Sequence, residues 1–230
     1  MRIGDSEFQD LVAQRLKEWQ VRQHLTEAEP APAAAVAPMR VVTVSREMGS
    51  GGSEIAQVIA CELGWDLWDR QIVDEIARSA HVRTEVVESL DEHTRSEVLS
   101  ILRELLGDRL QEAGYRYHLA QVVLTIARHG NAVIVGRGAN YLLPQAFNLR
   151  VVAPMAARAA RVAHREGISR DDAEHRCHAS DRERADFVRT LYGRDINNAL
   201  DYDVVANTGH LQSADAAAML AVGLRLRFGL

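Results

Sequence analysis

Short apolar runs alternate with longer amphipathic stretches over most of the chain. The runs predict β-strands at residues 41–45, 132–136, 149–153 and 203–207. Apolar residues follow one another in these runs without strict alternation, as expected of parallel strands that are buried on both faces. Strands that alternate with helices predict an α/β fold with a mainly parallel, doubly wound sheet and right-handed crossovers.

Local sequence signals indicate where several helices begin. Thr94-Arg95-Ser96-Glu97 has the form of a capping box and predicts a helix from there through Leu110, and Ser169 is expected to start a similar helix over 173–191. A last helix is predicted over 213–227. Its apolar residues are expected to pack on the sheet, namely Ala216, Leu220, Val222 and Leu224.

The pattern also predicts how the chain is divided. Residues 1–38 are expected to form an amphipathic helix (6–27) and a Pro/Ala linker (30–38), ahead of a main domain over 39–230. The N-terminal helix could dock on the main domain or pair with another copy to give a homo-oligomer, or it could be a weakly attached extension. The mostly helical stretch of about 70–130 is too long for a simple crossover and predicts an inserted lid or substrate-binding subdomain.

Composition narrows the class of protein. The chain has 230 residues, of which 47% are hydrophobic and 26% charged, as in an ordinary globular protein. Its net charge of −5 gives no reason to expect nucleic acid or an anionic membrane as a partner. Two cysteines are too few for a disulfide framework or a Cys-based zinc site. With no apolar run as long as a membrane span and no hydrophobic signal region, a cytoplasmic location is expected.

The most informative segment follows the first predicted strand. A glycine-rich turn there ends in Ser53, where a helical pattern starts. Backbone N–H groups in such a loop, together with the dipole of the following helix, favour a bound phosphate. Against the phosphate-loop pattern G-x-x-x-x-G-K-[ST], Gly51 and Ser53 match, whereas Arg46 stands at the first glycine and Gly52 at the lysine. A turn that joins strand to helix without a ligand is the alternative.

Two side chains of this loop are candidate contacts for the metal ion or the phosphates. The hydroxyl of Ser53 would contact Mg²⁺. Arg46 could supply the positive charge of the missing lysine from the other end of the loop, because a guanidinium is always charged and can bind phosphate oxygens in a bidentate way.

Further arginines follow predicted strands. Arg137 lies between two glycines after the strand at 132–136, at the sheet edge where ligands bind in open α/β folds. Arg158, Arg161 and Arg165 have spacings that place them on one helical face, which is costly without an anion. A solvated arginine in a turn and a solvated basic face are the alternatives.

A second group combines an acid with a base. Asp181 and Arg184 share a helical face and form either an ordinary surface ion pair or a clamp for a substrate sugar and phosphate.

The ordered set of motifs resembles the cytidylate kinase-like family over about residues 39–230. The matching pieces are Ser45-Arg46-Glu47-Met48-Gly49-Ser50-Gly51-Gly52, Asp69-Arg70, Gly136-Arg137-Gly138, the arginine helix after Val152-Ala153-Pro154, Asp181-x-x-Arg184 and Tyr202-Asp203-Val204-Val205-Ala206-Asn207-Thr208.

This resemblance implies a P-loop three-layer fold with a helical substrate-binding insert and an arginine-rich lid. It also implies transfer of the γ-phosphoryl group of ATP to CMP or dCMP with Mg²⁺. Gly49, Ser50, Gly51, Gly52 and Ser53 would then hold the ATP phosphates, with Ser53 on the metal. The lid arginines would be Arg158 and Arg161, and the acceptor nucleotide would contact Asp69, Arg70, Arg137, Asp181 and Arg184.

Two positions depart from the pattern of typical cytidylate kinases. Gly52 replaces the loop lysine, and Gly138 replaces an aspartate that follows the Gly-Arg pair. The expected function is ATP-dependent phosphoryl transfer to a small phosphorylated acceptor, with CMP or dCMP as the leading expectation. The alternative is a nucleotide-binding sensor or regulatory module without efficient kinase activity.

Overall fold

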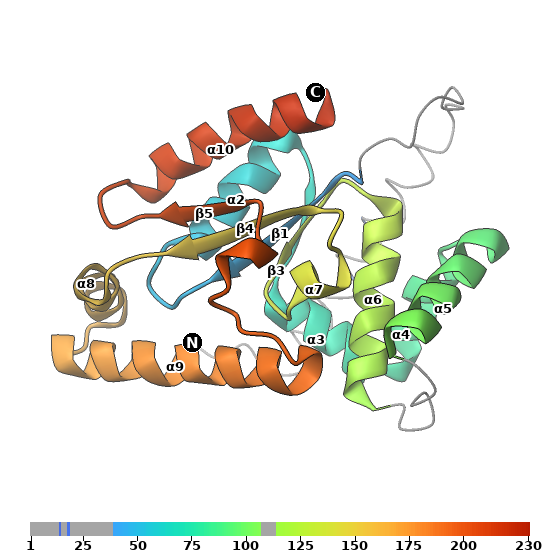
Figure 1. Ribbon diagram of the computed structural model, residues 1–230, viewed down its shortest axis with the longest axis horizontal. Helices are drawn as coiled ribbons and strands as arrows, with labels where there is room; N and C mark the ends of the chain where they lie inside the picture. The colour runs from blue at the N-terminus through green and yellow to red at the C-terminus, as the bar shows by residue number, and fades with distance from the viewer. Residues whose placement is uncertain (1–13, 15–17, 19–38, 107–113) are drawn as a thin grey trace. The chain divides into compact units, whose positions relative to one another are not determined.

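The computed structural model describes residues 39–106 and 114–230, together with Gln14 and Glu18 (Figure 1). The predicted N-terminal helix and linker therefore lie almost wholly outside the described residues. The described chain divides into a core unit, Arg40–Leu67 with Asn131–Leu230, and a helical unit within Trp68–Gly130.

In the described chain, five strands form one sheet in the order β2-β3-β1-β4-β5. They are β1 (Val41–Arg46), β2 (Asp66–Trp68), β3 (Ala132–Val135), β4 (Phe147–Val152) and β5 (Val204–Asn207). β1 pairs in parallel with both β3 and β4, and β4 pairs in parallel with β5. The prediction of an α/β fold with a mainly parallel sheet is confirmed.

Helices cover the sheet and its edge in the core unit. They are α2 (Gly52–Leu63), α7 (Ala139–Leu142), α8 (Met155–Glu166), α9 (Arg170–Tyr192) and α10 (Ser213–Phe228), with the short 3-10 helix η2 (Ala199–Asp201). Figure 1 shows α2 and α10 packed side by side over the same face of the sheet. Their buried residues, among them Ile55 and Leu224, pack on Val42, Val44 and Leu149 of the strands. This apolar layer holds the start of α2 against the end of β1.

The helical unit comprises α3 (Arg70–Arg78), α4 (Ala80–Glu88), α5 (Glu92–Leu106) and α6 (Tyr115–His129). Helix α6 packs against the other three. Polar contacts reinforce this packing: Tyr115 donates a hydrogen bond to Asp74, and Arg128 pairs with Glu97 at 3.0 Å. None of the described helices is both long and apolar enough to cross a membrane.

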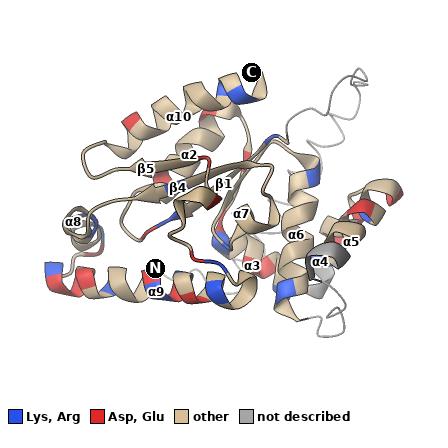
Figure 2. Ribbon diagram, in the orientation of Figure 1, with Lys and Arg blue, Asp and Glu red and all other residues tan. Residues whose placement is uncertain are grey.

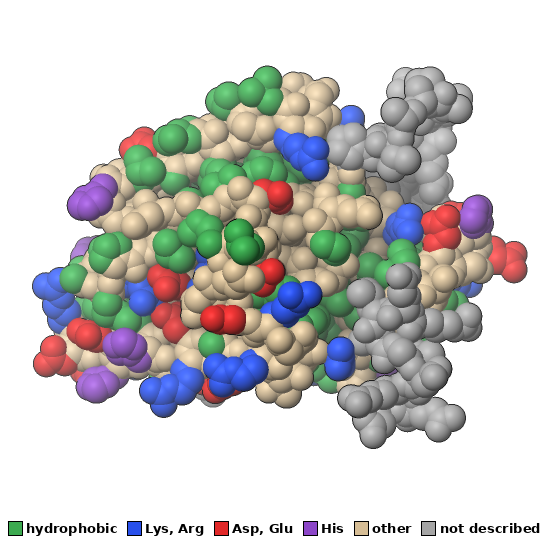
Figure 3. Space-filling view, in the orientation of Figure 1, with side chains coloured by type: hydrophobic (Ala, Val, Ile, Leu, Met, Phe, Trp, Pro, Cys, Tyr) green, Lys and Arg blue, Asp and Glu red, His purple; other side chains and the backbone are tan. Residues whose placement is uncertain are grey.

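Two local expectations are wrong, and one strand was not predicted. The strand that was not predicted is β2, whose three residues include no β-branched run. Helix α5 begins at Glu92 rather than at Thr94, because the backbone N–H of Thr94 donates to the carboxylate of Asp91, 3.0 Å away. Val222 does not pack on the sheet, because its side chain is 57% exposed. Figure 3 shows that hydrophobic side chains are exposed over α10.

The predicted start of the helix after residue 168 is confirmed. Ser169 is the N-cap of α9, and its hydroxyl accepts a hydrogen bond from the backbone N–H of Asp172 at 3.1 Å. The same hydroxyl donates to the Asp172 carboxylate at 2.6 Å. This cap fixes the beginning of the helix that carries Asp181 and Arg184.

We expect Ser169→Ala to lower the free energy of unfolding by about 1 kcal/mol, because it removes the side-chain acceptor of the cap. Ser169→Asn is the matched control, since its amide oxygen still accepts from the N–H of residue 172. Urea unfolding of both variants measures the difference. Equal stability of Ser169→Ala and the native chain would contradict the importance of the cap.

Candidate active site

The glycine-rich loop joins the end of β1 to the start of α2. The chain leaves β1 for β2, returns through β3 and then crosses to β4 on the other side of β1. Such a reversal of strand order at the carboxyl ends of parallel strands is where ligands bind in open α/β sheets. The loop therefore lies at the place in this fold that is best suited to a phosphate ligand.

Backbone geometry shapes the loop for an anion. Gly49 and Gly51 have φ angles of +78° and +79°, and Gly51 is the N-cap of α2. Residues with side chains rarely adopt these angles. Ser53, in the first turn of α2, is exposed. Its hydroxyl is thus accessible beside the positive end of the helix dipole.

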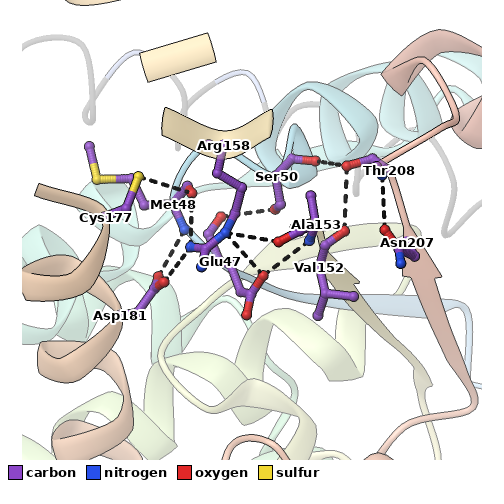
Figure 4. A network of polar contacts seen from close by, with 12 residues as sticks. Glu47, Met48, Ser50, Val152, Ala153, Arg158, Cys177, Asp181, Asn207 and Thr208 are labelled. Atoms are coloured by element: carbon purple, nitrogen blue, oxygen red, sulfur yellow. Dashed lines mark hydrogen bonds and ion pairs between the residues drawn. The ribbon is translucent and has the colours of Figure 1, made fainter. Parts of the chain in front are cut away.

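Hydrogen bonds of Ser50 fix the middle of the loop. Ser50 is fully buried, and its hydroxyl donates to the carbonyl of Glu47 at 2.9 Å. The carbonyl of Ser50 accepts from Thr208 Oγ1 at 2.7 Å. Thr208 follows β5 and is itself fully buried, so the segment after β5 holds the loop from a second strand (Figure 4).

Arg158, on α8, is a buried guanidinium at the centre of the site. It is 6% exposed and lies among oxygen atoms of the loop, β4 and α9. Its Nε donates to Ala153 O at 3.0 Å and lies 3.4 Å from the Glu47 carboxylate, while its Nη1 donates to Met48 O at 3.3 Å. The same Nη1 forms an ion pair with Asp181. Two carboxylates of the protein itself therefore compensate the charge of Arg158, so this arginine needs no bound anion.

Asp181 joins α9 to the loop. Its Oδ1 accepts from the backbone N–H of Met48 at 2.9 Å and from Arg184 Nη2 at 3.2 Å, and its Oδ2 pairs with Arg158. The predicted ion pair between Asp181 and Arg184 is therefore present in the structure. The carboxylate also binds the loop directly, which the helical spacing did not indicate.

Cys177 lies one turn before Asp181 on α9. Its thiol is buried and donates to Met48 O over 3.6 Å. Burial raises the pKa of this thiol. Figure 4 shows Cys177 next to Met48 and near Arg158 and Asp181. The reactivity of this thiol therefore reports whether α9 is packed against the loop.

Arg161, one turn after Arg158, also approaches the loop. Its Nη1 donates to Gly49 O at 3.2 Å and to Thr208 Oγ1 at 3.1 Å, and its Nη2 donates to Thr208 O at 2.6 Å. The third arginine of this row, Arg165, is exposed and pairs with Glu166 at 2.8 Å. Two of the three arginines thus face the loop and one faces solvent.

Arg137 lies against α9. It adopts φ +54°, its guanidinium carbon is 4.8 Å from the ring centre of Phe187, and its carbonyl accepts from Tyr192 OH at 2.7 Å. Phe187 is three residues after Arg184, so the two share a helical face. The structure thus brings Arg137 to the part of α9 that also carries Arg184. Both charges of α9, basic and acidic, are visible in Figure 2.

Asp69 and Arg70 belong to the helical unit. Asp69 is the N-cap of α3, and its carboxylate accepts from the backbone N–H groups of Gln71 at 2.8 Å and Ile72 at 3.0 Å. Arg70 is the exposed first residue of α3. Their contact with an acceptor nucleotide stays a prediction.

Sequence reasoning assigned no role to Glu47, Thr208 or Arg150. Arg150 is 4% exposed in β4 and donates to Ser45 Oγ and Asn197 Oδ1, both at 2.9 Å. An arginine between the apolar residues of a predicted buried strand indicates from the sequence alone that its charge has partners inside the protein. Glu47 and Thr208 have no such local signal for their contacts with Arg158 and Ser50.

A mainly parallel sheet with a glycine-rich loop between β1 and α2 is the arrangement found in P-loop proteins. The model of the cytidylate kinase-like family matches residues 41–210. This chain belongs to that family. The resemblance noted from the motifs is confirmed, and it classes the chain with the nucleoside monophosphate kinases.

Individual relatives agree with this membership. The cytidylate kinase of Ignicoccus hospitalis is 30% identical over 172 residues, which is 74% of this chain and 90% of that protein. The cytidylate kinase of Thermococcus kodakarensis is 30% identical over 176 residues, covering 74% of this chain and 80% of that protein.

A solved structure of an uncharacterized protein from Eubacterium ventriosum superimposes with a TM-score of 0.65. It is 19% identical, with coverage of 82% of this chain and 99% of that one. At this identity the likeness shows the fold alone.

We expect Asp181→Asn to lower the melting temperature by roughly 5 °C and to weaken ATP binding, because Arg158 loses one of its two carboxylates and the loop loses a charged acceptor. Asp186→Asn is the matched control: Asp186 lies on the same helix and forms an exposed pair with Arg189. Calorimetry and nucleotide titration measure both effects. If only acceptor affinity changed, Asp181 would contact the acceptor rather than hold the loop.

We expect a thiol reagent at pH 8 to modify Cys61, which is exposed, much faster than Cys177. The thiolate is the reacting form, and the raised pKa of Cys177 leaves less of it at any pH below that pKa. A Cys61→Ala variant isolates Cys177, which should react fully in guanidinium. Equal rates for both thiols in the folded protein would contradict this burial.

Proposed function

We propose that this chain transfers the γ-phosphoryl group of ATP to CMP or dCMP. The observation that carries the proposal is the position of arginines around the loop. Arg158 and Arg161 position its carbonyls from α8, and Arg137 lies against the part of α9 that carries Arg184. Phosphoryl transfer depends mainly on positioning and on positive charge around the transferring group. The cytidylate kinase relatives support the choice of a cytidine nucleotide as acceptor.

In this proposal backbone N–H groups within residues 49–53 bind the ATP phosphates, apart from that of Ser50, which donates to Glu47 O at 3.3 Å. A bound anion at the start of α2 is favoured by the helix dipole and by the N–H groups that have no partner within the helix. Arg137 and Arg184 bind the acceptor monophosphate, since a guanidinium matches a phosphate with two parallel hydrogen bonds.

Mg²⁺ fits the residues that are present. The described residues contain no cluster of three or more His, Cys, Asp or Glu side chains that could hold a metal. Mg²⁺ needs no such cluster, because it usually keeps several waters and binds substrate phosphates together with one or two protein oxygens. The exposed hydroxyl of Ser53 is our candidate for that protein oxygen, and the ion would neutralise charge on the phosphates.

A second candidate is favoured by one observation. Gly52 stands in the place of the loop lysine, and loss of one donor to a developing charge costs on the order of 3 kcal/mol in the barrier. A chain that binds nucleotides but turns them over inefficiently would act as a sensor or regulatory module.

Coupled measurement of ADP release separates the two candidates. We expect ADP to form with ATP, Mg²⁺ and CMP or dCMP, and to stay at background with AMP, GMP, UMP or no acceptor. Nucleotide titration in the same samples reports ATP binding. Tight ATP binding without ADP release on any acceptor would overturn the kinase and support the sensor, whereas release on another acceptor would overturn the cytidine assignment.

A further inference from the structure

The space at position 52 is already filled. A Cβ atom added to Gly52 would lie 2.5 Å from Arg46 Cβ and 3.2 Å from Val151 Cβ. Contacts under 3.0 Å are essentially never made by real Cβ atoms, and here both neighbours are attached directly to their backbones. A lysine therefore does not fit at position 52 while residue 46 carries a Cβ.

The other end of the Arg46 side chain lies beside β3. A Cβ at Gly136 would overlap Arg46 Nη1, and Gly136 has φ +83°. The side chain thus extends from the first residue of α2 to the turn that follows β3. That turn continues into Arg137, one of the two arginines assigned above to the acceptor monophosphate.

We propose that Arg46 replaces the lysine of the phosphate loop, and that Gly52 is a glycine because it leaves room for the Cβ of Arg46. This inference rests on the proposed function. The guanidinium lies against Gly136, at the turn before Arg137, while the Cβ of the same side chain lies against Gly52 at the start of α2. In the proposed function the start of α2 binds the donor phosphates and Arg137 binds the acceptor, so the transferred phosphoryl group passes between these two places.

Replacing the lysine by Arg46 conserves the positive charge beside the phosphates. A lysine at position 52 would bring one ammonium to the β- and γ-phosphates. Arg46 brings one guanidinium from the opposite end of the same loop, so the net charge at the transferring group is unchanged. Its fork of donors can bind two phosphate oxygens at once, which a lysine ammonium does less specifically.

Arg158 and Arg161 have a different role in this arrangement. Arg158 is paired with two carboxylates, and Arg161 donates to the backbone oxygen of Gly49 and to Thr208. Both hold the loop in shape from α8. Arg46 is instead the last residue of β1, directly before the loop, so the sheet fixes its backbone next to the loop.

The test uses the steric conflict between a side chain at position 52 and the Cβ of residue 46. Arg46→Gln removes the charge and keeps a side chain of similar shape, so we expect kcat to fall roughly a hundredfold while the melting temperature changes little. Arg46→Gly with Gly52→Lys turns the loop into Gly-Glu-Met-Gly-Ser-Gly-Lys-Ser, the full phosphate-loop pattern. This double variant should recover at least a tenth of the native kcat.

Arg46→Ala with Gly52→Lys is the matched control. Alanine retains the Cβ that conflicts with a side chain at position 52, so this pair should stay inactive or lose stability. Native turnover in Arg46→Gln, or equal recovery in both double variants, would overturn the inference.

A binding measurement keeps the inference testable if the native chain proves inactive and the proposed function fails. Arg46 should then make the affinity for ATP greater than that for ADP, because it faces the γ-phosphate. Loss of this preference in Arg46→Gln supports the inference, and an unchanged ratio of the two dissociation constants overturns it.

Discussion

The site depends on one buried guanidinium. Arg158 is 6% exposed and contacts oxygen atoms from the loop, from the end of β4 and from α9. A buried charge is tolerated only when it is paired and its donors are satisfied, and Glu47 and Asp181 provide the pairing. Because these partners come from separate segments, the same requirement fixes the positions of those segments. The shape of the phosphate loop therefore follows from the electrostatic demands of a residue on another helix.

Much of the fold could be predicted from local patterns, whereas the internal contacts of the site could not. The β-branched run at the start of β1 and the cap at Ser169 are encoded by neighbouring residues, so the sequence indicates both. Asp91 and Thr94 both have side chains that cap helices, and only the geometry shows that Thr94 donates to Asp91 and lies inside the helix. Helical spacing correctly joined Asp181 to Arg184, but it carried no information on Arg158, which lies on α8.

The hydrogen bonds that hold the loop act on its backbone carbonyls. Backbone carbonyls of Met48, Gly49 and Ser50 accept hydrogen bonds from Arg158, Arg161 and Thr208. These bonds orient the peptide groups, and a peptide group whose carbonyl is held on one side directs the next N–H toward the other. Preorganised dipoles of this kind favour a bound anion without further rearrangement, which is how proteins stabilise charge that develops during a reaction.

At both positions that depart from the pattern of typical cytidylate kinases, a neighbouring side chain lies where a Cβ would be, and Gly138 in addition has φ +65°. At Gly52 the space for a side chain is filled by Arg46, and at Gly138, where an aspartate is usual, a Cβ would overlap the ring of Tyr192. Tyr192 in turn donates to the carbonyl of Arg137, so the ring that excludes an aspartate also holds the arginine beside it. At both positions a neighbouring side chain therefore occupies the space that a side chain of the glycine itself would need.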